Sequence, residues 1–264
     1  MIVLFTDFGL TGPYVGQVKA ALIQEAPGVP IVDLMHDAPT FHPKAAAYLL
    51  AAFIDEFPPD SLFLCVVDPG VGTESRLPIS LTVDRRRFVG PNNGLFSVVA
   101  RRARQVQATE ITWRPHRLSA SFHGRDLFAP VAAMLARGES VIGRPLAVES
   151  VIMPSWPQEL AQVIYIDHFG NAMTGLRAEG LHTSQRIVMP TNMDHQPHTA
   201  PATDTVLHYA RTFGEVPAGR GFWYENANGL VEIAVNQGNA ARQFGLQVGS
   251  PVTGLPPVGL SNSQ

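Results

Sequence analysis

Short apolar runs alternate with amphipathic stretches along the N-terminal part of the chain. The β-branched runs at 2–6, 31–34 and 62–67 predict strands, and the stretches that begin at Pro13 and Pro43 repeat their apolar residues at the helical interval. Strands that alternate with helices of this length favour a mostly parallel sheet with helices on both faces. The pattern therefore predicts an α/β domain.

Two of these predicted strands end at an aspartate that precedes a glycine turn. Asp7 is followed by Phe-Gly, and Asp68 is followed by Pro-Gly-Val-Gly at 69–72. Because parallel strands deliver their carboxyl ends to one edge of a sheet, we expect Asp7 and Asp68 at the same edge, where α/β folds bind ligands. Asp-Pro-Gly is also a good turn on its own, so a purely structural role for Asp68 stays open.

Later segments of the same domain add candidate polar residues. The runs at 79–83 and 87–89 read as strands, and a turn at 90–94 precedes a helix at 95–103; Asn92 and Asn93 in that turn suit either turn formation or contact with a polar ligand.

A second candidate cluster lies just ahead of a predicted helix. His123, Arg125 and Asp126 are more polar residues than a helix start needs, although a lone histidine there is more often structural than catalytic.

The pattern changes after residue 152. Two prolines around Trp156 indicate a linker at 153–160, and the remainder is rich in strand-like runs with few helical periods. We therefore predict an N-terminal α/β domain at 1–152 and a smaller C-terminal β-barrel domain at 161–264. The predicted strands are 161–166, 186–189, 205–209, 221–224 and 230–235.

The C-terminal domain holds one carboxylate at a strand end and one histidine pair. Asp167 follows an apolar strand, with Asn171 close behind it in the same turn. His195 and His198 form an H-x-x-H pattern, but no third patterned ligand accompanies them, so we predict no metal site.

Composition narrows the ligand class and the compartment. Of 264 residues, 45% are hydrophobic and 16% charged, with a net charge of -3, which gives no basic face for nucleic acid and favours a small-molecule ligand. The single cysteine, Cys65, lies in an apolar strand, which fits a reduced cytoplasmic protein. The longest apolar run, 45–54, is about half of a membrane span, and the N-terminus lacks the pattern of a signal peptide.

Several common catalytic motifs are absent from the sequence. There is no phosphate-binding G-x-x-x-x-G-K-[ST] loop, no complete dinucleotide fingerprint, no G-x-S-x-G elbow and no paired-cysteine metal site. Phosphoryl transfer, hydride transfer and serine hydrolysis are therefore disfavoured.

Six ordered motifs together resemble one known family. The chain is similar to the S-adenosylmethionine hydrolases, also called SAM hydroxide adenosyltransferases, which are relatives of the fluorinase and chlorinase. The motifs are TDFG at 6–9, VDPGVGT at 67–73, FVGPNNGL at 88–95, FHGRDLFAP at 122–130, IDHFGN at 166–171 and EIAVNQG at 232–238.

The resemblance implies a reaction and an assembly. It implies hydrolysis of S-adenosylmethionine to adenosine and methionine by water or hydroxide that attacks C5′ of the ribose, without a metal or other cofactor. It also implies a homotrimer in which the N-terminal domain of one subunit and the C-terminal domain of its neighbour form each active site. No nucleic-acid or membrane partner is expected.

The resemblance also implies roles for particular residues. The catalytic constellation falls on Asp68, His123 and an arginine; relatives usually place that arginine where this chain has Ser75, and a one-residue insertion makes Arg76 its counterpart. Asp7 would hold the ribose hydroxyls and Asp167 the methionine ammonium. The residues implied at the adenosine end are Asn171, Glu232 and Val235.

Three other functions stay open at this point, one of which is an α/β protein that binds a metal through the loop with His195 and His198. A halogenase of the same superfamily would present uncharged or aromatic groups to a halide, whereas a carboxylate at position 68 would repel it. A nucleoside-binding protein without turnover would fit if Arg76 does not reach the site.

Overall fold

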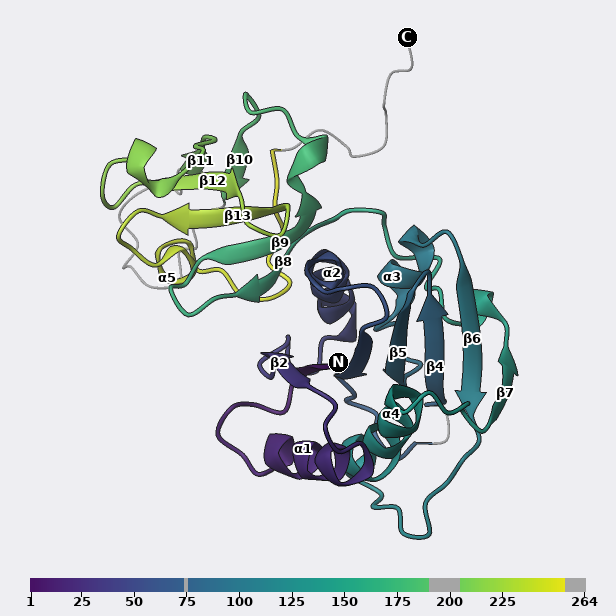
Figure 1. Cartoon of the computed structure of the whole chain (residues 1–264). Helices are drawn as coiled ribbons and strands as arrows, with labels where there is room; N and C mark the ends of the chain where they lie inside the picture. The colour runs from purple at the N-terminus through teal and green to yellow at the C-terminus, as the bar shows by residue number, and fades with distance from the viewer. Residues whose placement is uncertain (74–75, 190–204, 255–264) are drawn as a thin grey trace. The chain divides into compact units, whose positions relative to one another are not determined.

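The computed structural model describes residues 1–73, 76–189 and 205–254, and the chain divides into two compact units (Figure 1). The first unit is Met1–Ser155 and the second is Trp156–Gln264. The division falls inside the segment 153–160 that the two prolines mark as a linker in the sequence.

The first unit is built on a seven-stranded sheet with the order β2-β1-β3-β5-β4-β6-β7. The pairings β2–β1, β1–β3 and β3–β5 are parallel, and the remaining three are antiparallel. The strands are β1 Ile2–Thr6, β2 Ile31–Met35, β3 Leu62–Val66, β4 Pro78–Val83, β5 Arg86–Pro91, β6 Val106–Ile111 and β7 Gly143–Leu146.

The parallel half of this sheet agrees with the sequence prediction, and the antiparallel half adds to it. Strands β4 and β5 form a hairpin whose turn contains Asp84 in the left-handed region, with φ of 51°. Strands β6 and β7 were not predicted. Strand β7 lies at the edge of the sheet with its first three residues exposed, and Gln107, Thr109 and Glu110 interrupt the apolar pattern of β6.

Helices cover both faces of the sheet. Along β1, Ile2 and Leu4 face one side, where Val18 of α1 and Val131 of α4 complete a core. On the other side Phe63 of β3 stacks on Phe88 of β5, which in turn contacts Phe96 at the start of α3. The helices are α1 Tyr14–Glu25, α2 Pro43–Phe53, α3 Ser97–Arg102 and α4 Ala129–Ala136, with short helical turns at Ile54–Glu56 and Val148–Ser150.

The sheet places the two strand-end aspartates side by side. Strands β1 and β3 are parallel neighbours in which Thr6 lies opposite Val66. Because β2 lies on one side of β1 and β3 on the other, the chain reverses direction across the sheet here, and such switch points open a crevice at the carboxyl ends. The expectation that Asp7 and Asp68 share one edge is confirmed.

The helix after His123 has an unusual start. Residues Gly124–Phe128 form a π-helical turn that continues directly into α4. The sequence predicted the helix but not this wider turn, because the apolar spacing of its side chains does not distinguish the two. Single π-turns often mark functional sites, and this one follows a candidate catalytic residue.

The second unit is mainly antiparallel β-structure. One sheet has the order β12-β13-β9-β8 and a second pairs β10 with β11, so the described strands form two sheets and no closed barrel. Strand β9 was not predicted, since Gly175 interrupts its pattern; this glycine lies directly against Leu160 of β8. The elements are β8 Leu160–Ile166, β9 Ala172–Arg177, β10 Ile187–Met189, β11 Thr205–Leu207, β12 Gly221–Glu225, β13 Leu230–Val235, α5 Ala240–Phe244 and short turns at Ala178–Gly180 and Phe213–Glu215.

Within the described parts of the chain, every helix is too short or too polar to cross a membrane.

Candidate active site

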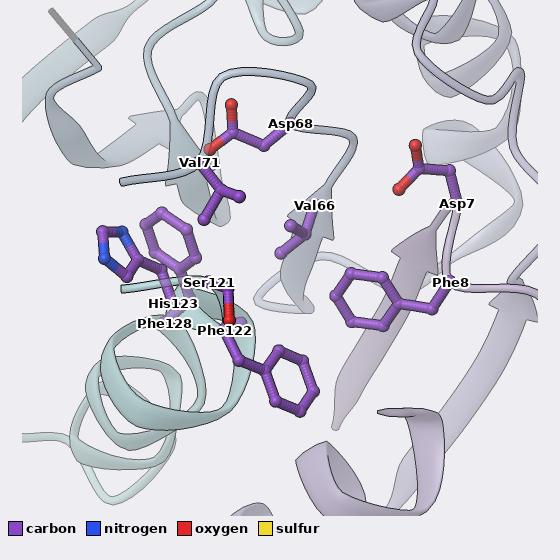
Figure 2. Close-up of a pocket in the computed structure, with 10 residues that line it drawn as sticks. Asp7, Phe8, Val66, Asp68, Val71, Ser121, Phe122, His123 and Phe128 are labelled. Atoms are coloured by element: carbon purple, nitrogen blue, oxygen red, sulfur yellow. The ribbon is translucent and has the colours of Figure 1, made fainter. Parts of the chain in front are cut away.

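The carboxyl ends of β1 and β3 open onto a small cavity in the first unit (Figure 2). Asp7, Asp68 and His123 all line it, and its volume is about 60 Å³, enough for a few water molecules. Three of the predicted site residues are therefore brought together from segments far apart in the sequence. The other lining residues are Phe8, Val66, Val71, Ser121, Phe122, Gly124 and Phe128.

Hydrogen bonds within the turn and from a neighbouring loop hold the Asp68 turn in place. The backbone N–H of Gly70 donates to Oδ1 of Asp68 at 3.2 Å. The amide of Asn93, which is 5% exposed, donates to the carbonyl of Val67 at 2.8 Å. Asn93 therefore supports the end of β3, and Asn92 donates to the carbonyl of Ser150; both asparagines act structurally here.

A glycine lets the Asp68 turn approach the segment that carries His123. Gly72 adopts φ of +82°, and a Cβ atom at this position would lie 2.4 Å from the carbonyl oxygen of Ala120. Any other residue would therefore be strained and would push the two segments apart. This close approach explains how Asp68 and His123 reach one cavity.

The cavity changes the acidity of both aspartates. Burial raises the pKa of Asp68 above the ordinary carboxyl value, while the Gly70 N–H and the positive charges of Arg76 and His123 oppose that rise. Burial likewise raises the pKa of Asp7; the Phe41 N–H opposes this and the charge of Asp68 adds to it. A carboxylate with a raised pKa accepts a proton from water more readily.

Arg76 is the arginine that acts on Asp68. Its guanidinium passes over Gly70, since a Cβ built on that glycine would lie 2.7 Å from Nε of Arg76. Ser75, the residue at the usual arginine position, lies outside the described residues. Arg76 is not among the lining residues of the cavity, so its influence on Asp68 is electrostatic.

Arg125 and Asp126 hold the His123 segment in place. Asp126 Oδ2 accepts the backbone N–H of Ser119 at 2.8 Å and the guanidinium of Arg125 at 2.9 Å. Arg125 also donates to Oε1 of Gln17 in α1 at 2.7 Å and lies 5.1 Å from the ring centroid of Phe122. The polar cluster that the sequence marked thus contains one cavity residue, His123, and two residues that fix the loop around it.

The second unit has a larger cavity, of about 750 Å³. Asp167, Asn171 and Val235 line it, which brings together three more of the predicted substrate-binding residues. Its size falls within the range of small-molecule sites. The other lining residues are Phe169, Phe213, Tyr224, Gln237, Gly238, Asn239 and Arg242.

Asp167 forms a compact turn with Asn171. Its Oδ1 accepts the backbone N–H groups of Phe169 at 2.9 Å and Asn171 at 2.8 Å, and its Oδ2 accepts the Asn171 side-chain amide at 3.0 Å. These bonds fix the direction of the Asp167 carboxylate. The same geometry makes Asp167 suitable for holding a cationic group.

Glu232 does not line this cavity. It is 2% exposed and accepts the hydroxyl of Tyr224 at 2.5 Å and the amide of Asn226 at 2.8 Å. Burial raises the pKa of Glu232, and burial followed by this hydrogen bond raises the pKa of Tyr224. Glu232 therefore lies behind the wall and supports Tyr224, a lining residue that the sequence analysis did not identify.

Most residues missed by the sequence analysis are the apolar and aromatic lining residues. Phe8, Phe122 and Phe213 resemble ordinary core residues in the sequence, although ligand cavities are usually lined in this way. In the described segments no group of three or more metal-ligating side chains gathers. His195 and His198 lie outside the described residues.

Comparison with protein families matches both units of the chain. The model described as SAM hydroxide adenosyltransferase N-terminal domain matches residues 2–143, and the corresponding C-terminal domain matches residues 161–253. The chain belongs to the SAM hydroxide adenosyltransferase family. The resemblance seen in the six sequence motifs is therefore confirmed.

Individual relatives extend over nearly the whole chain. The (R)-S-adenosyl-L-methionine hydrolase of Thermus thermophilus is 37% identical, covering 95% of this chain and 98% of that protein. The crystal structure of an uncharacterised conserved protein from Thermotoga maritima superposes with a TM-score of 0.81 at 29% identity, covering 96% and 98% of the two chains. A fluorinase from an Actinoplanes species is a more distant family relative, 24% identical with 96% of each chain covered.

Proposed function

We propose that this protein hydrolyses S-adenosylmethionine to adenosine and L-methionine. The observation that carries the proposal is the cavity in which Asp68 and His123 come together beside Asp7 at the end of two parallel strands. The Thermus relative, named as an S-adenosylmethionine hydrolase, and the family match support the same reaction.

The chemistry needs an aimed and partly desolvated water more than it needs an acid. A sulfonium leaves as a neutral thioether, so no proton has to be given to the leaving group. In our proposal Asp68 and His123 orient the attacking water, and one of them accepts one of its protons as its oxygen bonds to C5′ and the C5′–S bond breaks; the other proton stays on the 5′ oxygen of adenosine. Arg76 keeps Asp68 ionised and stabilises hydroxide character.

The other predicted residues hold the two ends of the substrate. Asp7 accepts the ribose hydroxyls, Asp167 binds the methionine ammonium, and Asn171 and Val235 contact the adenosine end. Glu232 contributes through Tyr224. Following the family resemblance, we propose a homotrimer in which one subunit supplies the first cavity and its neighbour the second, so that the two sets of residues meet in the assembly.

A halide as nucleophile is disfavoured by the charge at position 68. Asp68 and Asp7 line the same cavity of about 60 Å³, and two carboxylates there would repel a fluoride or chloride ion. Water, in contrast, can donate hydrogen bonds to both. We therefore assign the nucleophile to water, and we propose that the reaction takes place in the cytoplasm and uses no cofactor.

The experiment that tests this proposal is incubation of the protein with S-adenosylmethionine in ¹⁸O-labelled water, followed by mass spectrometry of the products. We expect one ¹⁸O atom in adenosine, at the 5′ oxygen, and none in methionine. Absence of adenosine would leave only a binding protein, and a 5′-halo product after addition of halide would identify a halogenase; either result refutes the proposal.

A parallel incubation with a chelator tests the metal-independent mechanism. We expect unchanged turnover after treatment with EDTA, because the proposed proton acceptors are Asp68 and His123. Loss of turnover that returns on addition of a divalent cation would contradict this mechanism.

A further inference from the structure

His36 is a buried titratable residue that the proposed mechanism does not use. It lies just after β2, is 3% exposed, and has a partner at each ring nitrogen. Nδ1 lies 2.8 Å from the hydroxyl of Thr6, and Nε2 lies 3.1 Å from Oδ1 of Asp33. Asp33 is also bound by Lys19 at 2.9 Å.

The partners of His36 determine the direction of these hydrogen bonds. An ionised carboxylate only accepts hydrogen bonds, so Nε2 of His36 donates to Asp33. In the neutral ring Nδ1 is then an acceptor, and the Thr6 hydroxyl donates to it. The lone pairs of Thr6 Oγ1 remain free to accept, and the backbone N–H of Phe8 points to that oxygen at 3.4 Å.

These hydrogen bonds enclose Asp7, which lies between Thr6 and Phe8. The carbonyl of Thr6 accepts the N–H of Ala38 at 3.0 Å, and the carbonyl of His36 accepts the N–H of Gly9 at 2.6 Å. The chain segment that starts at His36 therefore holds the Asp7 turn on both sides. Farther along the same segment, the backbone N–H of Phe41 donates to the Asp7 carboxylate itself at 3.3 Å.

Asp7 needs such support because it shares its cavity with Asp68. Two like charges in a partly buried site repel each other, and a carboxylate on an unsupported turn would rotate away. We propose that His36, acting through Thr6, is a positioning residue that aims Asp7 at the ribose hydroxyls of the substrate. This inference rests on the proposed function, in which Asp7 binds those hydroxyls.

The replacement Thr6→Val tests this inference with little change of shape. Valine is also β-branched but has no hydroxyl, so it removes the bonds to His36 Nδ1 and Phe8 N–H from a buried position that is 1% exposed. Thr6→Ser keeps the hydroxyl and serves as the matched control. Thr6→Ala also removes the hydroxyl and replaces the valine variant if that variant does not fold.

The decisive readout is the ratio of kcat/KM for S-adenosylmethionine to kcat/KM for its 2′,3′-dideoxy analogue. We expect Thr6→Val to lower kcat/KM for S-adenosylmethionine by about 10-fold, mainly through KM, because a displaced Asp7 loses its grip on the ribose. For the 2′,3′-dideoxy analogue, which offers Asp7 nothing to hold, we expect a change of less than about 2-fold. Thr6→Ser should restore the wild-type ratio. If Thr6 mattered only for stability, Thr6→Val would lower kcat/KM equally for both substrates, and that result would overturn the inference.

A binding measurement separates this inference from the proposed reaction. Calorimetry compares adenosine with 2′,3′-dideoxyadenosine for wild type and Thr6→Val, and it needs no turnover. If the wild type prefers adenosine and Thr6→Val loses that preference, the positioning role stands even if S-adenosylmethionine is not hydrolysed. If the wild type binds both nucleosides equally, or the variant keeps the preference, the positioning role is wrong whatever the turnover.

Discussion

Replacing Gly70 by alanine tests the position of Arg76 without replacing any proposed catalytic residue. A Cβ atom at Gly70 would lie 2.7 Å from Nε, 3.3 Å from Cγ and 3.4 Å from Nη2 of Arg76. The backbone of Gly70 is outside the left-handed region, so alanine fits it without strain. Arg76, whose end is flexible, is what has to move.

The size of the effect follows from that contact. Ordinary carbon contacts are about 3.5–4.0 Å, so the guanidinium has to withdraw by about 1 Å from its place beside the Asp68 turn. A shift of that size in a catalytic group costs up to about 100-fold in rate, and we expect a 10- to 100-fold fall in kcat/KM. Stability should change little, because glycine-to-alanine replacement stabilises by about 0.4–1 kcal/mol and the displaced contact offsets part of that gain.

The assay is release of adenosine from S-adenosylmethionine, measured together with thermal unfolding. Gly180→Ala is the matched control, since a Cβ atom there meets nothing within 4 Å. Arg76→Ala gives the upper limit, and Gly70→Ala combined with Arg76→Ala should be no slower than Arg76→Ala alone. Full activity of Gly70→Ala, or a further loss in the double variant, would refute the view that Arg76 acts from this position.

Three further predictions concern charged residues in and around the two cavities. Asp126→Asn weakens the support of the His123 loop, so we expect kcat/KM to fall by about 10-fold. The control Glu139→Gln breaks a similar arginine pair on the surface. An equal loss of kcat/KM in both variants would show that the effect does not come from the His123 loop. Turnover should rise with pH as Asp68 ionises. Because the charge of Arg76 lowers the pKa of Asp68, Arg76→Ala should move that rise to higher pH. An unchanged pH profile of turnover in Arg76→Ala would contradict this prediction. Burial raises the pKa of Glu232 in the folded protein, which adds stability below the ordinary carboxyl pKa, and this stability is lost as pH rises through the raised pKa. Glu232→Gln should therefore flatten the fall of the free energy of unfolding with pH, measured by chemical denaturation. An unchanged slope would contradict this prediction.

The parts of the site that depend on local pattern were predictable from the sequence. Apolar runs that stop at Asp7 and Asp68 indicate strand ends, and the alternation of strands with helices places those ends at one edge of a parallel sheet. His123 was marked by its polar neighbours ahead of a helix. These predictions succeed because strand ends, turns and helix starts are determined by neighbouring residues.

Only the tertiary structure decided which polar residues face a cavity and which stand behind it. Glu232 and Val235 are three positions apart on β13, so their side chains point to opposite faces of the sheet. Glu232 shares its face with Tyr224, and no local sequence pattern indicates this pairing. The support that His36 provides crosses 30 residues of chain to Thr6, and the link from Arg125 to Gln17 crosses 108. The sequence by itself thus determined where the strands of the first unit end and which carboxylates they carry. The contacts between His36 and Thr6 and between Phe41 and Asp7 were decided by tertiary packing, because each joins segments that meet only in the folded chain.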